Sequence, residues 1–345
     1  MRITFPVLTL CIGGAQRMLA ELANGLVARG HEVTLLMPRG AEVKHPVQAK
    51  IQWVQGPLMR ERDYPVSDVI VSNFYTTVES AHEASQNGKG VHVRLSLCYE
   101  PCFLPANHDS LPTYHVTKHV LVLSDWQRQM ISLNHGMQGY IVPIGVGPQF
   151  KNLQIRGTFA APLQISAIVR KPEGGFSSHR EQNYLMHVLH NIKRSYPEVQ
   201  VNLFCPPAEF ASSPSLQALR DTREFRFLTP ADDEEMCYHY NETDIFVSAS
   251  SYDAGSLPGL EAMRCGAALI AIYSGGNTEY CRPEKNCLMS LRHEGRLDRD
   301  IVRLIEYPAL RRQLAAQGEY DSLSWTWERS VEAFETAIKQ IVSSP

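Results

Sequence analysis

Two carboxylates and a run of small residues stand close together in the stretch SSYDAGSLPGLEAMRCGAALIAIYSGGNTEY, residues 250–280. Asp253 and Glu261 are eight positions apart, and glycine, serine, leucine and proline fill most of the interval. Pro258 suits the first turn of a helix, where a missing N–H costs nothing. The stretch therefore predicts a strand end, a loop that starts near Asp253, and a helix that carries Glu261 in or just after its first turn.

The loop between the two acids has the composition of an anion site. Backbone N–H groups at a helix N-terminus lack partners inside the helix, and the helix dipole attracts negative charge there. We expect the amides of Gly255, Ser256 and Leu257 to form a small anion cradle. A plainer interpretation is that Glu261 only complements the helix dipole, but this leaves the spacing to Asp253 and the GSLPG loop unexplained.

A second glycine pair, Gly13 and Gly14, follows the first apolar run of the chain, and Arg17 lies one turn into the helix expected after it. Backbone without side chains can approach a phosphate closely, so this turn is a candidate nucleotide contact. The sequence CIGGAQR matches neither GxGxxG nor GxxxxGK, the fingerprints of dinucleotide and P-loop sites. A tight turn between a strand and a helix explains the pair equally well.

Two other patterns were tested as metal sites, and neither predicts one. The DRD sequence at residues 298–300 falls inside the helical stretch RLDRDIVRLIEYP, which is typical of a solvated helix face. His115 and His119 have i,i+4 spacing, but no third ligand is evident nearby. We therefore expect no bound metal.

The rest of the sequence predicts the scaffold that positions these residues. Apolar, β-branched runs alternate with amphipathic stretches, which indicates parallel sheets with helices on both faces. The pattern runs from RITFPVLTL to YIVPIG, is interrupted at VPIGVGPQF, and restarts at LQISAIV. We predict two doubly wound α/β domains, residues 1–148 and 149–325, and a final helix within 326–345 that packs on the first domain.

Composition and charge exclude several classes of protein. The chain has 345 residues, of which 44% are hydrophobic and 20% charged, as in ordinary globular proteins. A formal net charge of -3 gives no electrostatic case for a nucleic-acid partner. The apolar runs are too short to span a bilayer, and the N-terminal run lacks a cleavage site and leads into a glycine turn. Eight cysteines without a CxxC pair favour reduced thiols in the cytosol.

The acidic stretch resembles a known family. DAGSLPGLEAMRCGAALIA is similar to the E-x7-E region of retaining glycosyltransferases of the GT-B fold, particularly family 4, whose usual form is E-GFGLPPL-E-A-M-A-x-G-x-P-V. Other landmarks of the family follow in the same order: GGAQR, VLSDWQRQMI, VPIGV, DEEMCYHYNETDIFVSAS, GGNTEY and SWTWER. The resemblance implies two Rossmann-like domains that face each other, with a nucleotide-sugar held between them.

The resemblance also implies roles for the residues of the acidic stretch. Glu261 would hold the ribose hydroxyls, and Asp253 would contact the hydroxyls of the donor sugar. Hydrogen bonds to a charged group are worth roughly 1.5–3 kcal/mol each, so two such contacts would matter. Asp253 replaces the usual glutamate and is one methylene shorter. The amides of Gly255, Ser256 and Leu257 would hold phosphate and sugar.

The diphosphate leaving group needs positive charge, which the family supplies with the arginine and lysine of G-R-x-x-x-x-K-G. Here AIVRKPEGGFSSHRE follows the expected strand. Arg170 matches the arginine, whereas the place of the lysine falls at Gly174 or Gly175. We expect Arg170 to carry most of the diphosphate charge, with Lys171 or Arg180 in support. The Arg170-Lys171 pair could also be solvated surface charge.

The acceptor side is expected in the first domain. HVRLSLCYEPCFLP ends a strand and resembles the DYEPxFYP segment of some polysaccharide-building, rhamnosyltransferase-like members of the family. Glu100 in this segment could hold an acceptor hydroxyl, or it could cap the turn that follows.

These inferences together predict a retaining, metal-independent glycosyltransferase of the hexosyltransferase type. It would move a sugar from a UDP- or GDP-linked donor to a hydroxyl of a glycan, lipid-linked or small-molecule acceptor, without a cofactor and without a nucleic-acid partner. We expect a cytoplasmic protein, with peripheral association at the inner membrane face as a variant of this prediction. Two alternatives stay open: a nucleotide-sugar epimerase of the same fold, and a non-catalytic protein that binds nucleotide-sugar or glycan.

Overall fold

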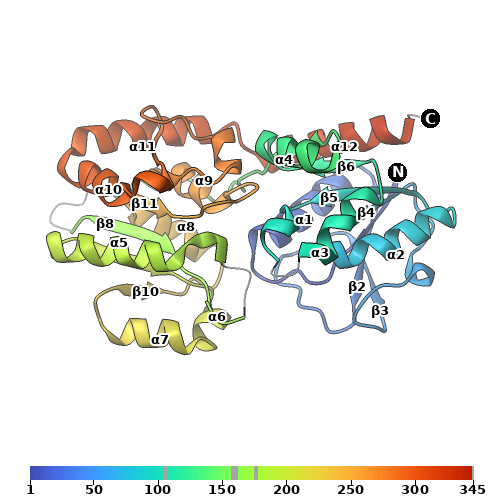
Figure 1. Ribbon diagram of the computed structural model, residues 1–345, viewed down its shortest axis with the longest axis horizontal. Coiled ribbons are helices and arrows are strands. Elements are labelled where there is room, and N and C mark those ends of the chain that lie inside the picture. Colours follow the sequence, from blue (N-terminus) through green and yellow to red (C-terminus); the bar gives the residue numbers. More distant parts are fainter. Residues whose placement is uncertain (105–106, 157–161, 175–177, 344–345) are drawn as a thin grey trace. The chain divides into compact units, whose positions relative to one another are not determined.

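The computed structural model describes residues 1–104, 107–156, 162–174 and 178–343 (Figure 1). The chain divides into two compact units. The first unit comprises Met1–Gly145 together with the segment from Thr326 onward, and the second unit comprises Val146–Trp325. The boundary therefore lies between Gly145 and Val146, and the sequence analysis placed it after residue 148.

The first unit is built on a seven-stranded parallel sheet in the order β3-β2-β1-β4-β5-β6-β7. The strands are β1 (Arg2–Pro6), β2 (Glu32–Pro38), β3 (Lys50–Val54), β4 (Val69–Ser72), β5 (Val91–Ser96), β6 (Val120–Val122) and β7 (Tyr140–Ile141). The helices are α1 (Gly14–Ala28), α2 (Tyr75–Gln86), α3 (Asn107–Ser110), α4 (Asp125–His135) and α12 (Trp327–Ser343).

The local sequence explains the elements of the first unit that matter most for the site. Helix α1 buries Met18, Leu19, Leu22 and Leu26 on one face, which is the apolar stripe expected of a helix that covers a sheet. Helix α4 begins where the Ser124 side chain accepts a hydrogen bond from the Gln127 amide, and it ends at Gly136 in the left-handed conformation. Helix α4 begins close to the carboxyl end of β6, whereas residues 7–13 separate α1 from β1.

The final helix, α12, belongs to the first unit. The Phe334 side chain is fully buried, and its ring stacks on the Phe5 ring of β1 with 5.8 Å between the centroids. Glu335 forms ion pairs with Arg29 (2.9 Å) and His31 (3.2 Å) at the end of α1. The chain thus returns from the second unit to complete the core of the first, as the apolar stripe of this helix predicts.

Gly25 lets α1 and α12 approach each other. A Cβ atom at Gly25 would lie 2.3 Å from Val331 Cγ2, which is far inside van der Waals contact. We expect Gly25→Ala to destabilise the first unit by about 1–3 kcal/mol, as overpacking usually does, despite the better helix propensity of alanine. Urea unfolding followed by circular dichroism measures this. Gly25→Ala combined with Val331→Ala should recover part of the loss, and equal losses in the single and double variants would show that the helices do not touch here.

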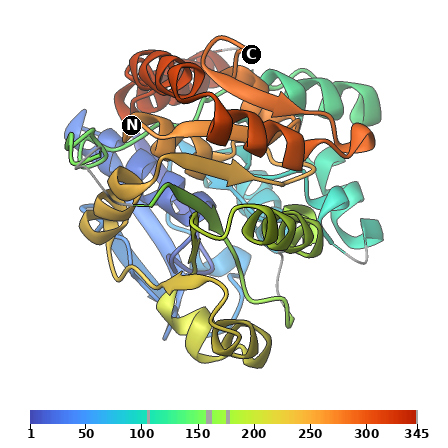
Figure 2. The same ribbon diagram turned by 90° about the vertical axis from the view of Figure 1, so that its left-hand side faces the viewer.

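The second unit holds a six-stranded parallel sheet in the order β10-β9-β8-β11-β12-β13. The strands are β8 (Gln164–Ile168), β9 (Gln200–Phe204), β10 (Arg226–Leu228), β11 (Ile245–Ser248), β12 (Ala268–Ile272) and β13 (Cys287–Ser290). The helices are α5 (Gln182–Ser195), α6 (Pro207–Ala211), α7 (Pro214–Asp221), α8 (Asp233–Glu242), α9 (Leu257–Arg264), α10 (Leu297–Glu306) and α11 (Pro308–Ser322). Figure 2 shows helices on both sides of this sheet.

The strand order of the second unit determines where a ligand would bind. The chain moves from β8 outward through β9 to β10, and then returns to the other side of β8 at β11. Loops after β8 and β11 therefore leave the sheet in opposite directions, which opens a crevice at the carboxyl ends of these two strands. Asp253 follows β11 and Arg170 follows β8, so the topology brings the acidic and basic motifs to the same crevice.

Buried polar contacts hold the helices that flank this crevice. Arg156 donates hydrogen bonds to the carbonyl oxygens of Tyr240 and Thr243 at the end of α8, and of Cys265 and Gly266 at the end of α9. Carbonyls at helix C-termini lack partners inside the helix, so one guanidinium satisfies two helix ends at once. The segment before β8 thereby fixes α9, which carries Glu261, against α8.

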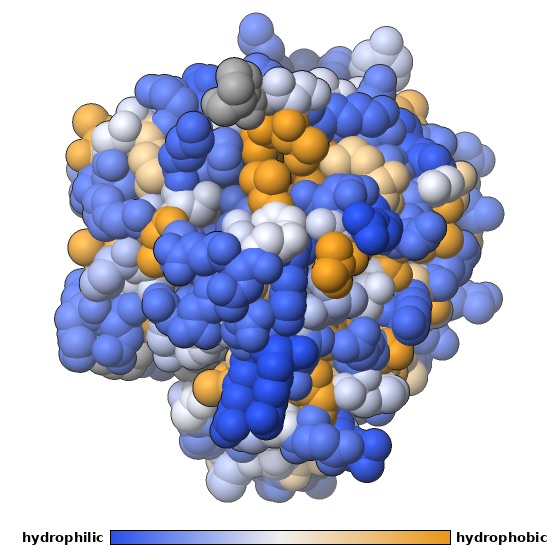
Figure 3. All heavy atoms as spheres, turned by 90° about the vertical axis from the view of Figure 1, so that its right-hand side faces the viewer, coloured by the Kyte–Doolittle hydropathy of each residue, from blue (hydrophilic) through white to orange (hydrophobic). Residues whose placement is uncertain are grey.

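Figure 3 shows a face on which hydrophilic side chains predominate, with apolar groups between them. Among the described residues, no helix combines the length and the apolar character needed to cross a membrane.

Candidate active site

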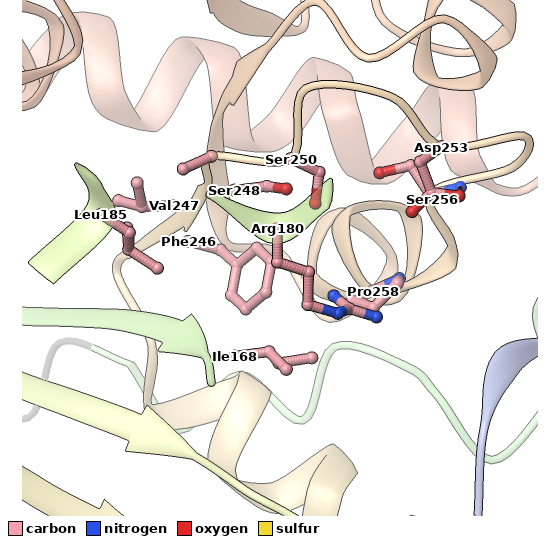
Figure 4. A pocket seen from close by; sticks show the side chains of 11 residues that line it. Ile168, Arg180, Leu185, Phe246, Val247, Ser248, Ser250, Asp253, Ser256 and Pro258 are labelled. Carbon is pink, nitrogen blue, oxygen red and sulfur yellow. Dashed lines mark hydrogen bonds between the residues drawn. The ribbon is translucent and has the colours of Figure 1, made fainter. Parts of the chain in front are cut away.

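A pocket lies at the crevice of the second unit (Figure 4). Its lining includes Ile168 at the end of β8, Arg180 before α5, and Asp253, Ser256 and Pro258 around the start of α9. In Figure 4 the Arg180 side chain extends across the pocket toward Pro258. A cation, a carboxylate and a helix N-terminus therefore share one small space, which suits a ligand that carries both phosphate and hydroxyl groups.

The Asp253 side chain organises the loop that follows it. Its Oδ1 atom accepts hydrogen bonds from the amides of Gly255 (3.1 Å) and Ser256 (2.9 Å). Both amides were expected to form the anion cradle with Leu257, and in this structure they already have an acceptor. A phosphate at this loop would compete with Asp253 for them, so the cradle stays a prediction.

The second glycine turn, in the sequence SGGNTEY, supports the acidic loop from behind. The Asp253 amide donates to the Ser274 carbonyl (2.7 Å), and the Gly276 amide donates to the Asp253 carbonyl (2.8 Å). A Cβ atom at Gly276 would lie 2.0 Å from the Ala254 carbonyl oxygen. The glycine is needed because backbone packs on backbone here, so the turn positions the loop from outside the pocket lining.

We expect Gly276→Ala to displace the acidic loop, because the clash is with backbone atoms that cannot rotate away. The second unit should lose about 1–3 kcal/mol of stability, as overpacked sites do. Nucleoside diphosphate affinity should fall at the same time, because Asp253 and Ser256 would move with the loop. Thermal melting and isothermal titration with UDP measure the two effects, and an unchanged affinity would mean that the loop does not contact the nucleotide.

Glu261 lies inside the second unit, and the described residues that line the pocket do not include it. Its side chain is buried, and the Tyr240 hydroxyl donates to Glu261 Oε2 at 3.2 Å. Tyr240 is itself fully buried, and its ring packs against Phe204 and Phe246. Burial raises the pKa of Tyr240 well above its ordinary value, so the phenol stays protonated and donates to the carboxylate. Sequence reasoning did not single out Tyr240, although it stands in the segment DEEMCYHYNETDIFVSAS that carried the resemblance.

Arg170 and Lys171 are engaged with a carboxylate that the sequence analysis did not consider. Arg170 Nε donates to both carboxylate oxygens of Glu209 on α6, at 2.9 and 2.8 Å, and Arg170 Nη2 also contacts Glu209. The Lys171 amide donates to Glu209 Oε2 at 3.0 Å. Burial opposes ionisation of Glu209, but the bonds from Arg170 outweigh it and hold the pKa of this carboxylate below its ordinary value. The charge of Arg170 is therefore largely compensated within the protein.

Arg180, one of the two cations expected to support Arg170, lines the pocket. It precedes α5 directly, and the next residue, Glu181, has φ 50° and ψ 40°. This left-handed conformation favours glycine, and glycine is the residue that follows lysine in G-R-x-x-x-x-K-G. The role of Arg180 in place of the lysine stays a prediction. Gly174, one of the two predicted positions, has open space around its Cα, and Gly175 lies outside the described residues.

The electrostatics of Arg180 fit a binding role. Burial lowers the pKa of its guanidinium, and the nearby Asp253 carboxylate opposes this effect. An arginine remains charged under such conditions, since its pKa starts far above neutrality. A charged group in a partly desolvated pocket interacts strongly with an incoming anion.

The glycine pair of the first unit forms the start of α1. Gly13 is the N-cap with an extended φ of 177°, a conformation open to any residue, and Gly14 is the first helical residue. The Arg17 amide donates to the Gly13 carbonyl (2.9 Å), and the Arg17 side chain lies 3.9 Å from Glu21. The expected nucleotide contacts of Gly13, Gly14 and Arg17 stay predictions.

Glu100 is enclosed in the first unit. Its side chain is 2% exposed, with Oε2 accepting from Arg94 Nη2 (2.9 Å) and from the Tyr114 hydroxyl (2.6 Å). The backbone carbonyl of Glu100, and not its side chain, closes the following turn by accepting from the amides of Phe103 and Leu104. The side chain thus neutralises a buried arginine. Arg94 in the apolar run HVRLSL was the signal for this pair, because a charge inside a buried strand needs a partner.

The described residues that line the pocket include none of the DRD aspartates or the paired histidines. Asp300, in the DRD sequence on α10, accepts a hydrogen bond from Ser290 and pairs with Arg296. His115 contacts His135 at 3.1 Å. Over the part of the chain that the structure describes, no group of three or more His, Cys, Asp or Glu side chains could hold a metal ion.

Comparisons with known proteins show which proteins this chain is similar to. Residues 174–320 match the model of the family Glycosyl transferases group 1. The D-inositol 3-phosphate glycosyltransferase of Geodermatophilus obscurus is 30% identical over 113 residues, which cover 32% of this chain. The match spans 24% of the length of that curated relative.

Solved structures resemble the chain over its whole length. Sucrose-phosphate synthase from Thermosynechococcus elongatus has a TM-score of 0.82 at 17% identity, with 100% of both chains covered. HepE of Anabaena, solved in complex with UDP and glucose, has a TM-score of 0.77 at 16% identity, with 99% of this chain and 100% of that chain covered. The chain therefore has the GT-B fold of two Rossmann-like domains, as predicted. Within that fold, the match to the group 1 glycosyl transferases covers the unit that contains the pocket.

Proposed function

We propose that this protein is a retaining glycosyltransferase that moves a hexose from a nucleotide diphosphate donor to an acceptor hydroxyl. The observation that carries the proposal is the pocket at the crevice of the second unit, where Arg180, Asp253 and the N-terminus of α9 converge. UDP is the first donor nucleotide to test, since HepE of Anabaena was solved with UDP and with UDP-glucose. GDP is the second.

Glu261, Arg180 and Asp253 each have a task in this proposal. Glu261, oriented by Tyr240, accepts hydrogen bonds from the ribose hydroxyls. Arg180 and the N-terminus of α9 stabilise the charge that develops on the diphosphate as the glycosidic bond breaks. Asp253 holds the loop in place through Oδ1 and offers its other oxygen to a hydroxyl of the donor sugar. The nucleotide leaves from the face that the acceptor attacks, which retains the anomeric configuration.

The proposal also covers the acceptor, the metal requirement and the location of the protein in the cell. The acceptor is a glycan, a lipid-linked saccharide or a small molecule, and the first unit carries the residues that contact it. Divalent metal is not required, and the protein acts in the cytoplasm or at the inner face of the membrane. Transfer assays with and without EDTA test the metal requirement directly.

One experiment separates the proposal from its alternatives. The protein is incubated with UDP- and GDP-linked sugars and a panel of acceptors, and the products are resolved by chromatography and mass spectrometry. A transferase releases free nucleoside diphosphate and extends an acceptor. An epimerase alters the sugar and leaves it attached to the nucleotide, and a binding protein leaves both unchanged.

Glu261→Gln and Asp253→Asn should divide binding from turnover. We expect Glu261→Gln to weaken UDP binding about 10- to 100-fold, because hydrogen bonds from the ribose to a carboxylate are charge-assisted. Asp253→Asn should keep a UDP affinity closer to that of the parent than Glu261→Gln does, and it should lose turnover instead. Isothermal titration and steady-state kinetics measure these effects, with the exposed Glu234→Gln on α8 as a control. Parent-like UDP affinity in Glu261→Gln would remove Glu261 from the nucleotide site.

A further inference from the structure

Ser256 has a backbone conformation that serine rarely adopts. It is the N-cap of α9, with φ 56° and ψ 48° in the left-handed region. This conformation brings Cβ close to backbone atoms, so it disfavours every residue with a side chain relative to glycine. The pattern E-GFGLPPL-E has glycine at the position of Ser256. This chain therefore carries a side chain where glycine would fit without strain, and retained strain of this kind clusters at functional sites.

The backbone of Ser256 is bound on both sides. Its amide donates to Asp253 Oδ1 (2.9 Å), and its carbonyl accepts from the Tyr280 hydroxyl (2.7 Å). Tyr280 is 3% exposed, so this second contact is shielded from water. The two bonds hold the residue in the left-handed region and fix the direction of its side chain.

The Ser256 hydroxyl, by contrast, has no partner within the part of the chain that the structure describes. The residue is 6% exposed, and its Oγ atom does not cap the amides at the start of α9. It lines the pocket beside Asp253, and Arg180 lines the same pocket (Figure 4). Ser256 Oγ is not among the described polar atoms that are fully buried without a partner, so it is accessible from the pocket, where a polar group that a ligand covers needs a hydrogen bond. A ligand bound in the pocket is therefore the remaining hydrogen-bond partner for the Ser256 hydroxyl.

We propose that Ser256 Oγ donates a hydrogen bond to a phosphate oxygen of the donor diphosphate, an inference that rests on the function proposed above. Arg180 and the α9 N-terminus, which face the same space as the Asp253 carboxylate, both attract negative charge. A hydroxyl can add a directed donor to this set, whereas the amides of Gly255 and Ser256 are directed at Asp253. Ser256 is thus a contact residue that this chain adds to the loop.

Two substitutions separate the hydroxyl from the strain. Ser256→Ala removes Oγ and keeps a side chain in the left-handed region, whereas Ser256→Gly removes both. We expect both variants to bind UDP about 10- to 100-fold more weakly than the parent, as when a hydrogen bond to a charged group is lost. We also expect the thermal midpoint of Ser256→Gly to equal or exceed that of the parent, since the strain is relieved.

A third substitution serves as the matched control. Arg223, in the loop after α7, also has a left-handed conformation, with φ 57°, but is exposed on the surface. Arg223→Gly relieves strain without touching the pocket, so its UDP affinity should equal that of the parent. A merely structural role for Ser256 would lower stability and affinity together, whereas the proposal requires them to move apart in Ser256→Gly.

The outcomes separate this inference from the proposed function. If the parent binds UDP or GDP, Glu261→Gln loses that binding, and both Ser256 variants keep it within about twofold, the Ser256 contact is overturned and the proposed function stands. If Ser256→Gly loses stability together with affinity, the role of Ser256 is structural and the inference is also overturned. A parent that binds neither nucleotide at millimolar concentration overturns the inference and the proposed function together.

Discussion

Arg180→Ala should lower turnover about 100- to 1000-fold, or roughly 2.7–4 kcal/mol of transition-state stabilisation, without loss of fold. Arg180 is the cation that lines the pocket with Asp253, and it lies partly desolvated there. Negative charge grows on the diphosphate only as the glycosidic bond breaks, so a cation in this place acts mainly on the transition state. Steady-state kinetics at saturating UDP-sugar measure the effect, and thermal melting checks the fold.

The control is Arg170→Ala. The sequence assigns the diphosphate charge mainly to Arg170, but the structure shows its guanidinium bound to Glu209 through several contacts. Much of its charge is compensated by that pair, so we expect a loss of about tenfold or less, near 1.4 kcal/mol. Arg180→Lys keeps the charge without the planar fork and should fall between Arg180→Ala and the parent.

One result would contradict this assignment, and a second would show that Arg180 acts through its charge. A loss of turnover of 100-fold or more in Arg170→Ala is the size expected when a group that stabilises the transition state is removed. If Arg180→Ala turned over like the parent at the same time, Arg170 would be the residue that stabilises the diphosphate charge. Glu209 would then release Arg170 when the donor binds. Rescue of Arg180→Ala by added magnesium, but not by sodium chloride at the same ionic strength, would mean that a metal ion can replace the charge of the guanidinium. Parallel assays with EDTA, magnesium and sodium chloride distinguish these cases.

The scaffold could be predicted because each element has a local signature. The stripe of α1, the acids in the first turn of α8 and the glycine that ends α4 each reflect a short-range preference that the tertiary structure keeps. The alternation of strands and helices then leaves few possible topologies, because the connection between two parallel strands of one sheet is nearly always right-handed. The edge strand β3 was not predicted, because its sequence KIQWV mixes polar and apolar residues and the strand is only partly buried.

The site was predictable only in the part that is local in sequence. Asp253 and Glu261 belong to one loop and one helix, so their spacing identifies them. Arg180 is different, because a longer loop separates it from Arg170, and only the folded chain shows that it lines the pocket with Asp253. No pattern of residue types in the sequence predicts that Arg180, and not Lys171, lines this pocket.

Contacts between distant segments were also hidden. Glu209 follows Arg170 by 39 positions and lies on a helix after the next strand of the sheet. The Tyr240 contact with Glu261 joins two helices, and its meaning depends on the complete burial of the tyrosine. Sequence supplies the groups that could bind a nucleotide, and the tertiary structure decides which of them are already bound to one another.

Glu100→Ala should destabilise the first unit by about 3–5 kcal/mol, because it leaves the charge of Arg94 buried without its counterion. Arg94 is fully buried and stacks on the Tyr114 ring, with 3.6 Å between the guanidinium carbon and the ring centroid. Removal of the carboxylate also takes an acceptor from the Tyr114 hydroxyl. Urea unfolding of the variant, followed by tryptophan fluorescence and circular dichroism, measures the loss.

A double replacement tests whether charge is the cause. Arg94→Met combined with Glu100→Leu exchanges the pair for apolar groups, and such exchanges of buried ion pairs are often neutral or stabilising. We therefore expect the double variant to recover most of the stability that Glu100→Ala loses. If Glu100→Ala is as stable as the parent but its acceptor KM rises, the carboxylate contacts the acceptor and the ion pair is secondary. If the double variant is stable and still transfers sugar, Glu100 supports the fold of the first unit and the acceptor is held by other residues.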